Sequence, residues 1–104
     1  MRNNRIRSVA VVRYPVLLVT FEDGLSGEYD VAELIERGPV FAPLKDKAFF
    51  ETVAVAPYGR SFGWNLDREG QEIDFCPDAT RIAIEIRIVD DLARQYEQQL
   101  IAAA

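Results

Sequence analysis

The sequence predicts an α+β fold: a small, mainly antiparallel sheet of hairpin-paired strands, one short helix and a long C-terminal helix. Three observations predict it. β-Branched residues such as Val9, Val11 and Val12 crowd the first twenty positions, as in strands. The dipeptide Asp23-Gly24 is typical of tight hairpins. The last quarter of the chain repeats apolar residues with the period of a helix. A chain of 104 residues is most simply one domain.

The first thirty residues predict paired strands, with an interruption at Pro15 and a return strand carrying Gly27 and Tyr29 on one face. A short helix is expected near 31 to 37. Asp30 precedes it and can accept from its first free amides, and Glu33 is placed to reach back in a capping-box arrangement. Gly38 ends that helix.

The segment GPVFAPLKDKAFF, residues 38 to 50, predicts an irregular crossing held by apolar anchors. Asp46 can cap a short helical turn that follows it. Burying one Phe or Leu contributes about 1.5–3 kcal/mol, so a few anchors can offset the cost of ordering the crossing. We therefore interpret the segment as packing. The expected anchors are Phe41, Leu44, Phe49 and Phe50. TVAVA then predicts a strand, and SFGWN and QEIDF a second hairpin.

The tail after Phe75 fits two patterns. Ile82, Ile84, Ile86 and Ile88 alternate with other residues over nine positions, as in a strand. The helical pattern covers the whole tail, with Pro77 and Asp78 at its start, so we predict a helix of about seven turns. Its apolar line has spacings of 4 and 3 in strict alternation, with Ile84 and Ile88 beside it. The line comprises Phe75, Ala79, Ile82, Ile86, Val89, Ala93, Tyr96 and Leu100.

Composition excludes several chemistries. The chain has no histidine, the commonest general base near neutral pH and the commonest metal ligand. Its one cysteine, Cys76, cannot form an intrachain disulfide and is expected to be a half-buried structural thiol. We predict a non-enzymatic protein with no cofactor and no metal. The absence of a signal-peptide pattern or a long apolar run predicts a cytoplasmic location away from membranes.

The order of features resembles the DUF2442 family of small bacterial proteins. The resemblance covers residues 6 to 80. It implies a compact α+β domain, which we assign to residues 1–80, and it implies no known catalytic residues. The helix pattern adds residues 81–104 as part of the same single domain. Some relatives carry a helix-turn-helix, but one predicted helix after Phe75 does not provide that motif. The matching residues are Phe21, Glu22, Asp23, Gly24, Gly38, Phe41, Leu44, Asp46, Phe50, Trp64 and Asp74.

The C-terminal helix provides the strongest interaction signal. Seven turns reach about 35 Å, which is longer than a domain of this length is wide. Part of its apolar line is expected to pack on the sheet, and the excess on a second copy of the chain or on a small neighbouring protein. The alternative is that the helix lies wholly on its own sheet. The residues expected in the interface are Ile82, Ile86, Val89, Ala93, Tyr96 and Leu100.

Other candidate sites have simpler structural explanations. Glu72 and Asp74, with Cys76, could support a weak metal-dependent enzyme, but solvated hairpin charges explain the two carboxylates.

Arg5, Arg7 and Arg13 share one strand parity and could contact nucleic acid. The net charge of −5 disfavours this. Lys45 and Lys47 could bind an anion, although lysines beside turns are usually only solvated.

An exposed aromatic platform is also conceivable, but a single tryptophan on a strand usually lies in the core. Its members would be Tyr14, Tyr29, Tyr58, Phe62 and Trp64.

Overall fold

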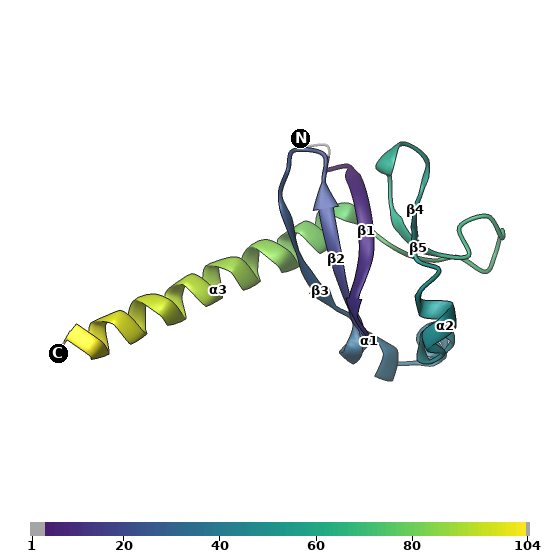
Figure 1. Ribbon diagram of the computed structural model, residues 1–104. Coiled ribbons are helices and arrows are strands. Elements are labelled where there is room, and N and C mark those ends of the chain that lie inside the picture. Colours follow the sequence, from purple (N-terminus) through teal and green to yellow (C-terminus); the bar gives the residue numbers. More distant parts are fainter. Residues whose placement is uncertain (1–3, 104) are drawn as a thin grey trace.

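The computed structural model describes residues 4–103 of the chain, and the side chains of residues 4–100 (Figure 1). It confirms the α+β class: two small antiparallel sheets, short helical segments and one long C-terminal helix. In chain order the elements are β1 Ile6–Arg13, β2 Val16–Phe21, β3 Ser26–Asp30, α1 Ala32–Glu36, the 3-10 helix η1 Pro39–Lys45, α2 Lys47–Phe50, β4 Ala54–Val55, the 3-10 helix η2 Pro57–Gly59, β5 Phe62–Trp64, β6 Ile73–Phe75 and α3 Pro77–Ala103.

The first sheet has the strand order β1-β2-β3, and both pairs are antiparallel. The turn between β2 and β3 contains the predicted Asp23-Gly24 pair. Gly24 has φ = 96°, in the left-handed region that glycine adopts without steric cost. A carboxylate oxygen of Asp23 accepts a hydrogen bond from the Leu25 amide. The hairpin prediction for this part of the chain is therefore confirmed.

The strands form two sheets rather than the single sheet that the sequence predicted. β4, β5 and β6 make a second antiparallel sheet in that order, with strands of only two or three residues. The helical segments between residues 32 and 50 separate it from the first sheet along the chain. One hydrophobic core nevertheless joins the two sheets, because β2 contributes Leu17 and Val19 while β5 contributes Phe62 and Trp64.

The crossing at residues 38–50 is packing, as predicted. Leu44 and Phe50 have no exposed surface, and Phe41 and Phe49 lie partly buried against the same core. The indole N–H of Trp64 donates to the Phe50 carbonyl at 2.8 Å. Leu44 belongs to the 3-10 helix η1 and Phe50 to α2, so the crossing is helical rather than irregular.

The two predicted helix caps have different outcomes. Asp46 caps α2, since its carboxylate accepts from the amides of Ala48 and Phe49. Asp30 accepts from the Ala32 amide at 2.9 Å. The capping box is not formed as predicted, because the N-cap residue of α1 is Val31 rather than Asp30. Glu33 is then two residues after the cap instead of three, and its carboxylate lies 3.8 Å from the Arg37 guanidinium on the next turn of the helix.

Candidate interaction surface

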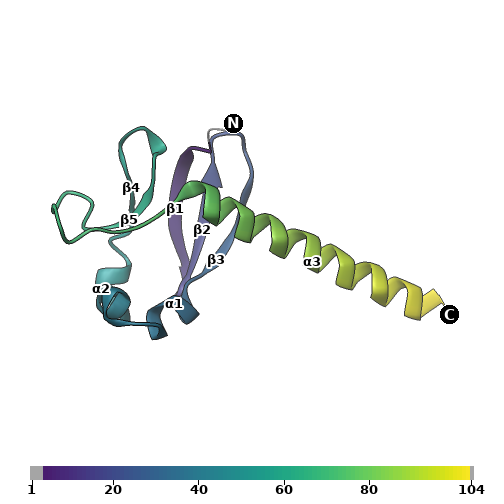
Figure 2. The ribbon, with the colours of Figure 1, turned by 180° about the vertical axis from the view of Figure 1, so that it is seen from behind.

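The C-terminal segment is a helix, and the strand interpretation of its isoleucines is wrong. α3 has 27 residues, which at about 1.5 Å per residue makes a rod about 40 Å long. Figures 1 and 2 show that only its first turns lie over the first sheet near β3, and that the remainder projects away from the body. The molecule accordingly measures 57 × 32 × 20 Å.

The helix docks on the body through Ile84, which is only 2% exposed. Ile84 packs directly over Gly27 in β3, where any larger residue would collide with the Ile84 side chain. The sequence predicted that part of the apolar line would pack on the sheet. That expectation is wrong: Ile82 and Ile86 are 58% and 63% exposed. A shift of two residues along a helix turns the side chain to nearly the opposite face, so the line faces away from the body.

Arg81 secures the base of the helix. Its guanidinium lies 2.9 Å from a carboxylate oxygen of Asp23 and 2.9 Å from one of Glu85, and it is placed over the Phe21 ring, 5.2 Å from the centroid. Burial by itself lowers the pKa of Arg81, but the hydrogen bonds to Glu85 and Asp23 outweigh it, and the net pKa is raised. The sequence pattern gave no reason to select Arg81, because its partner Asp23 lies in a distant turn.

We use "the seam" for the six predicted interface residues of α3. All six are exposed, and every residue from 85 to 100 is exposed, whether apolar or charged. The alternative that α3 lies wholly on its own sheet is therefore wrong. Phe75 does not continue this line, because it belongs to β6 and packs on the core. The seam comprises Ile82, Ile86, Val89, Ala93, Tyr96 and Leu100.

Two apolar residues extend the seam on one side. Leu92 is 58% exposed, and the sequence pattern does not predict it because it lies off the alternating spacings of 4 and 3. Ile88 is 38% exposed and was noted there as additional apolar surface. On the other side of the seam, Asp90 forms an ion pair with Arg94 at 3.2 Å on the same helix. The exposed surface of α3 is thus an apolar strip that widens into Leu92 and Ile88 on one side and is bordered by charged residues on the other.

Two of the three N-terminal arginines considered above contact other parts of the first sheet. Arg7 donates to the Glu22 carbonyl at 2.6 Å, and Arg13 donates to both carboxylate oxygens of Glu28. The hydrogen bonds from Arg13 lower the pKa of Glu28. Register shifts between Ile6 and Ser8 and between Val11 and Arg13 also break the simple alternation on which the shared parity of these arginines depended.

The carboxylates near the second hairpin gain no support as a metal site. Glu72, Asp74 and Cys76 are all exposed, and in the part of the chain that the structure describes no three acidic, cysteine or histidine side chains come together as metal ligands. The expectation of a half-buried Cys76 is wrong. Alternation along β6 turns Ile73 and Phe75 toward the core and leaves Asp74 and Cys76 outside.

The remaining candidates are also accounted for by packing or by solvent. Lys45 and Lys47 are both exposed, and the ammonium of Lys47 lies 5.5 Å from the centroid of the Tyr14 ring. The proposed aromatic platform does not form, because Phe62 and Trp64 are buried while Tyr58 is 76% exposed.

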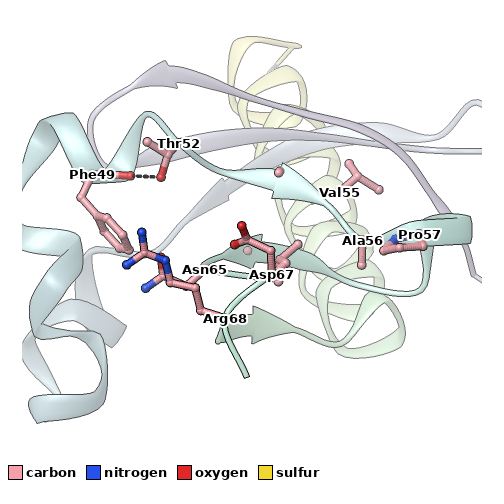
Figure 3. A pocket seen from close by; sticks show the side chains of 11 residues that line it. Phe49, Thr52, Val55, Ala56, Pro57, Asn65, Asp67 and Arg68 are labelled. Atoms are coloured by element: carbon pink, nitrogen blue, oxygen red, sulfur yellow. Dashed lines mark hydrogen bonds between the residues drawn. The ribbon is translucent and has the colours of Figure 1, made fainter. Parts of the chain in front are cut away.

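An open pocket of about 670 Å³ lies beside the second sheet (Figure 3). The Thr52 hydroxyl in its wall donates to the Phe49 carbonyl at 2.7 Å, Asp67 and Arg68 are solvent-exposed, and Asn65 is half-buried. A binding pocket usually presents a few fixed polar groups on a concave apolar wall. This hollow shows no buried charged group, so we do not assign a ligand to it.

Comparisons of the chain with protein-family models, with curated proteins and with solved structures each give no match. The resemblance to the DUF2442 family therefore stays a prediction based on the residues quoted above. No helix within residues 4–103 combines the length and the apolar character needed to cross a membrane. The exposed apolar strip on α3 is the feature with the clearest functional content.

Proposed function

We propose that this protein is a non-enzymatic protein-interaction module, cytoplasmic and homodimeric, in which the seam of α3 binds a second copy of the chain. The exposure of the seam is the observation that supports the proposal. Its five large members are each 54–65% exposed, although they are the residue types that proteins normally bury.

The size of the strip fits a protein partner. With Leu92, the large seam residues form a continuous exposed apolar strip from Ile82 to Leu100, about 27 Å long at 1.5 Å per residue. Contiguous exposed apolar surface, unlike scattered single residues, is typical of protein–protein contact sites. A long, narrow strip along one side of a helix is suited to another helix rather than to a compact ligand.

The projecting part of α3 also lacks other support. A helix stretch of about 15 residues is only marginally stable in water on its own, and most helical stability in proteins comes from packing of the apolar face. Between residues 85 and 100 one ion pair within the helix, Asp90 with Arg94, is present, and it is exposed. Such a pair contributes about 0.3–0.5 kcal/mol. Packing against a partner would provide the missing stabilisation.

A second copy is the simplest partner with a matching surface. Apolar residues that alternate at spacings of 4 and 3 form the contact line of two-stranded coiled coils, in which each helix provides both knobs and holes. The seam follows this repeat from Ile82 to Leu100 without interruption. The seam can therefore be the contact surface of both copies in a dimer with two-fold symmetry, where one surface must be complementary to itself.

The proposal is tested by placing a charge in the middle of the seam. Val89→Glu buries a carboxylate from each chain in the dimer without a partner, which costs several kcal/mol. We expect the dissociation constant measured by size-exclusion chromatography with light scattering to rise about 100-fold or more, since each 1.4 kcal/mol is tenfold. Helix content by circular dichroism should not fall, because Glu has a higher helix propensity than Val.

Gln98→Glu is the matched control for this experiment. Gln98 is exposed and lies on the side of α3 opposite Val89, so the variant adds the same charge outside the seam. We expect it to dimerise like the natural chain. Equal dissociation constants for the Val89→Glu and Gln98→Glu variants would contradict a seam interface.

A further inference from the structure

We infer that the two copies of α3 pair antiparallel, with the two-fold axis near Asp91, so that the bodies lie at opposite ends of the dimer. The inference rests on the proposed function and adds the orientation and register of the interface. It depends on three properties of the helix: the face used for docking, the residues bordering the seam and the sizes of the side chains along it.

The body does not obstruct a helix that lies along the seam. Ile84, which holds α3 on β3, is about 160° around the helix from Ile82 and from Ile86. Beyond the first turns α3 leaves the body altogether (Figure 2). α3 would therefore separate a second helix on the seam from the first sheet. The seam is open to such a helix along its whole length, from Ile82 to Leu100.

The borders of the seam disfavour a parallel pair. In parallel coiled coils the residue just before one seam position faces the residue just after the next one on the partner helix. This rule would place Glu85 against Asp90 of the second copy and Leu92 against Glu97 of the second copy. Both contacts occur twice by symmetry. Glu85 and Asp90 each have an arginine partner on their own helix, Arg81 and Arg94, so their contact is only weakly unfavourable. An apolar side chain held against the Glu97 carboxylate is the more costly contact.

An antiparallel pair changes these neighbours, because each border then meets the same border of the second copy. Glu85 faces the neutral Gln99, and Leu92 meets Leu92 across the axis. On the other border, Asp90 approaches Asp90 of the second copy once, but each carries Arg94 at 3.2 Å, so that the four groups together have no net charge. Leu92, which is 58% exposed on the single chain, meets an apolar side chain in this orientation instead of a carboxylate.

Side-chain sizes along the seam are also more even from layer to layer in the antiparallel register than in a parallel one. Its layers pair Ile82 with Leu100, Ile86 with Tyr96, and Val89 with Ala93 of the second copy. In a parallel pair Ala93 would face Ala93 and Tyr96 would face Tyr96, leaving one layer underfilled and the other crowded. Close packing without voids favours layers of even volume.

Single cysteines in a Cys76→Ser background test the orientation on the full chain. Cys76 is exposed, so its replacement leaves the core unchanged. At about 1.5 Å per residue, the two residues at position 92 lie about 3 Å apart along the axis of the antiparallel pair, and those at position 86 about 15 Å apart. A short thiol crosslinker should therefore convert most of the Leu92→Cys chain, and only a small minority of the Ile86→Cys chain, into covalent dimer.

The outcomes separate the two proposals. Preferential crosslinking of the Leu92→Cys variant supports the antiparallel pair. Preferential crosslinking of the Ile86→Cys variant, equal crosslinking of both, or none in a chain that is dimeric by sedimentation would overturn the orientation while leaving the dimer. If the Cys76→Ser chain sediments as a monomer at every concentration, the proposed function itself is wrong, and the antiparallel pair with it.

Discussion

Replacing Gly63 with alanine is expected to unfold most of the chain. Gly63 is the middle residue of β5, and a Cβ there would run into the Ile73 carbonyl oxygen and lie 2.7 Å from the Asp74 Cα on the neighbouring strand. Backbone atoms in a paired strand cannot move aside as a flexible side chain can. We expect urea denaturation to show a loss of about 4 kcal/mol or more in the free energy of unfolding. This is most of the total free energy of unfolding of a small domain.

Gly38→Ala is the control for this prediction. Gly38 has extended backbone with φ = 169°, and a Cβ added there meets no atom within 4 Å. The variant should unfold within about 0.5 kcal/mol of the natural chain. Equal stability of the Gly63→Ala and Gly38→Ala variants would show that β5 and β6 do not pair as closely as described.

Trp64→Ala is the second large effect. The indole is 1% exposed, its ring centroid lies 5.3 Å from that of Phe50 and 5.9 Å from that of Phe75, and its N–H donates to a backbone carbonyl. Truncation removes these contacts and leaves a cavity in the core shared by the two sheets. Urea denaturation should show a loss of about 3–5 kcal/mol.

Tyr58→Ala serves as the comparison for an aromatic residue outside the core. Tyr58 is 76% exposed, and the Arg60 guanidinium lies 5.6 Å from its ring centroid. We expect a change of no more than about 1 kcal/mol, because exposed cation–π pairs are worth about 0.5–1 kcal/mol. A Trp64→Ala variant as stable as this one would mean that the tryptophan is not a core residue.

The helical nature of the tail could be predicted because the spacing of 4 and 3 persists through the seam, whereas the strand pattern stops after Ile88. The face that docks could not be predicted. Ile84 binds the body only because Gly27, far away in the sequence, leaves room for it in β3. Local periodicity identifies the apolar faces of a helix, but the shape of the partner surface decides which face it accepts.

The same limit explains the other errors. The prediction that the N-terminal arginines share one face assumed a strand with regular alternation. Two register shifts in β1 break that alternation. Arg81 was overlooked because an ion pair with the β2–β3 turn depends on tertiary placement. Asp46 and Trp64 were predicted well, since capping requires only neighbouring amides and a lone tryptophan in so small a chain supplies much of the apolar core.

Sedimentation equilibrium of the natural chain, run from low to high concentration, tests the association most directly. If the exposed apolar strip of α3 binds a second copy, the mass will rise with concentration to twice the 11.8 kDa of one chain. A constant mass of 11.8 kDa up to the highest concentration would contradict the account, and the strip would then require another occupant.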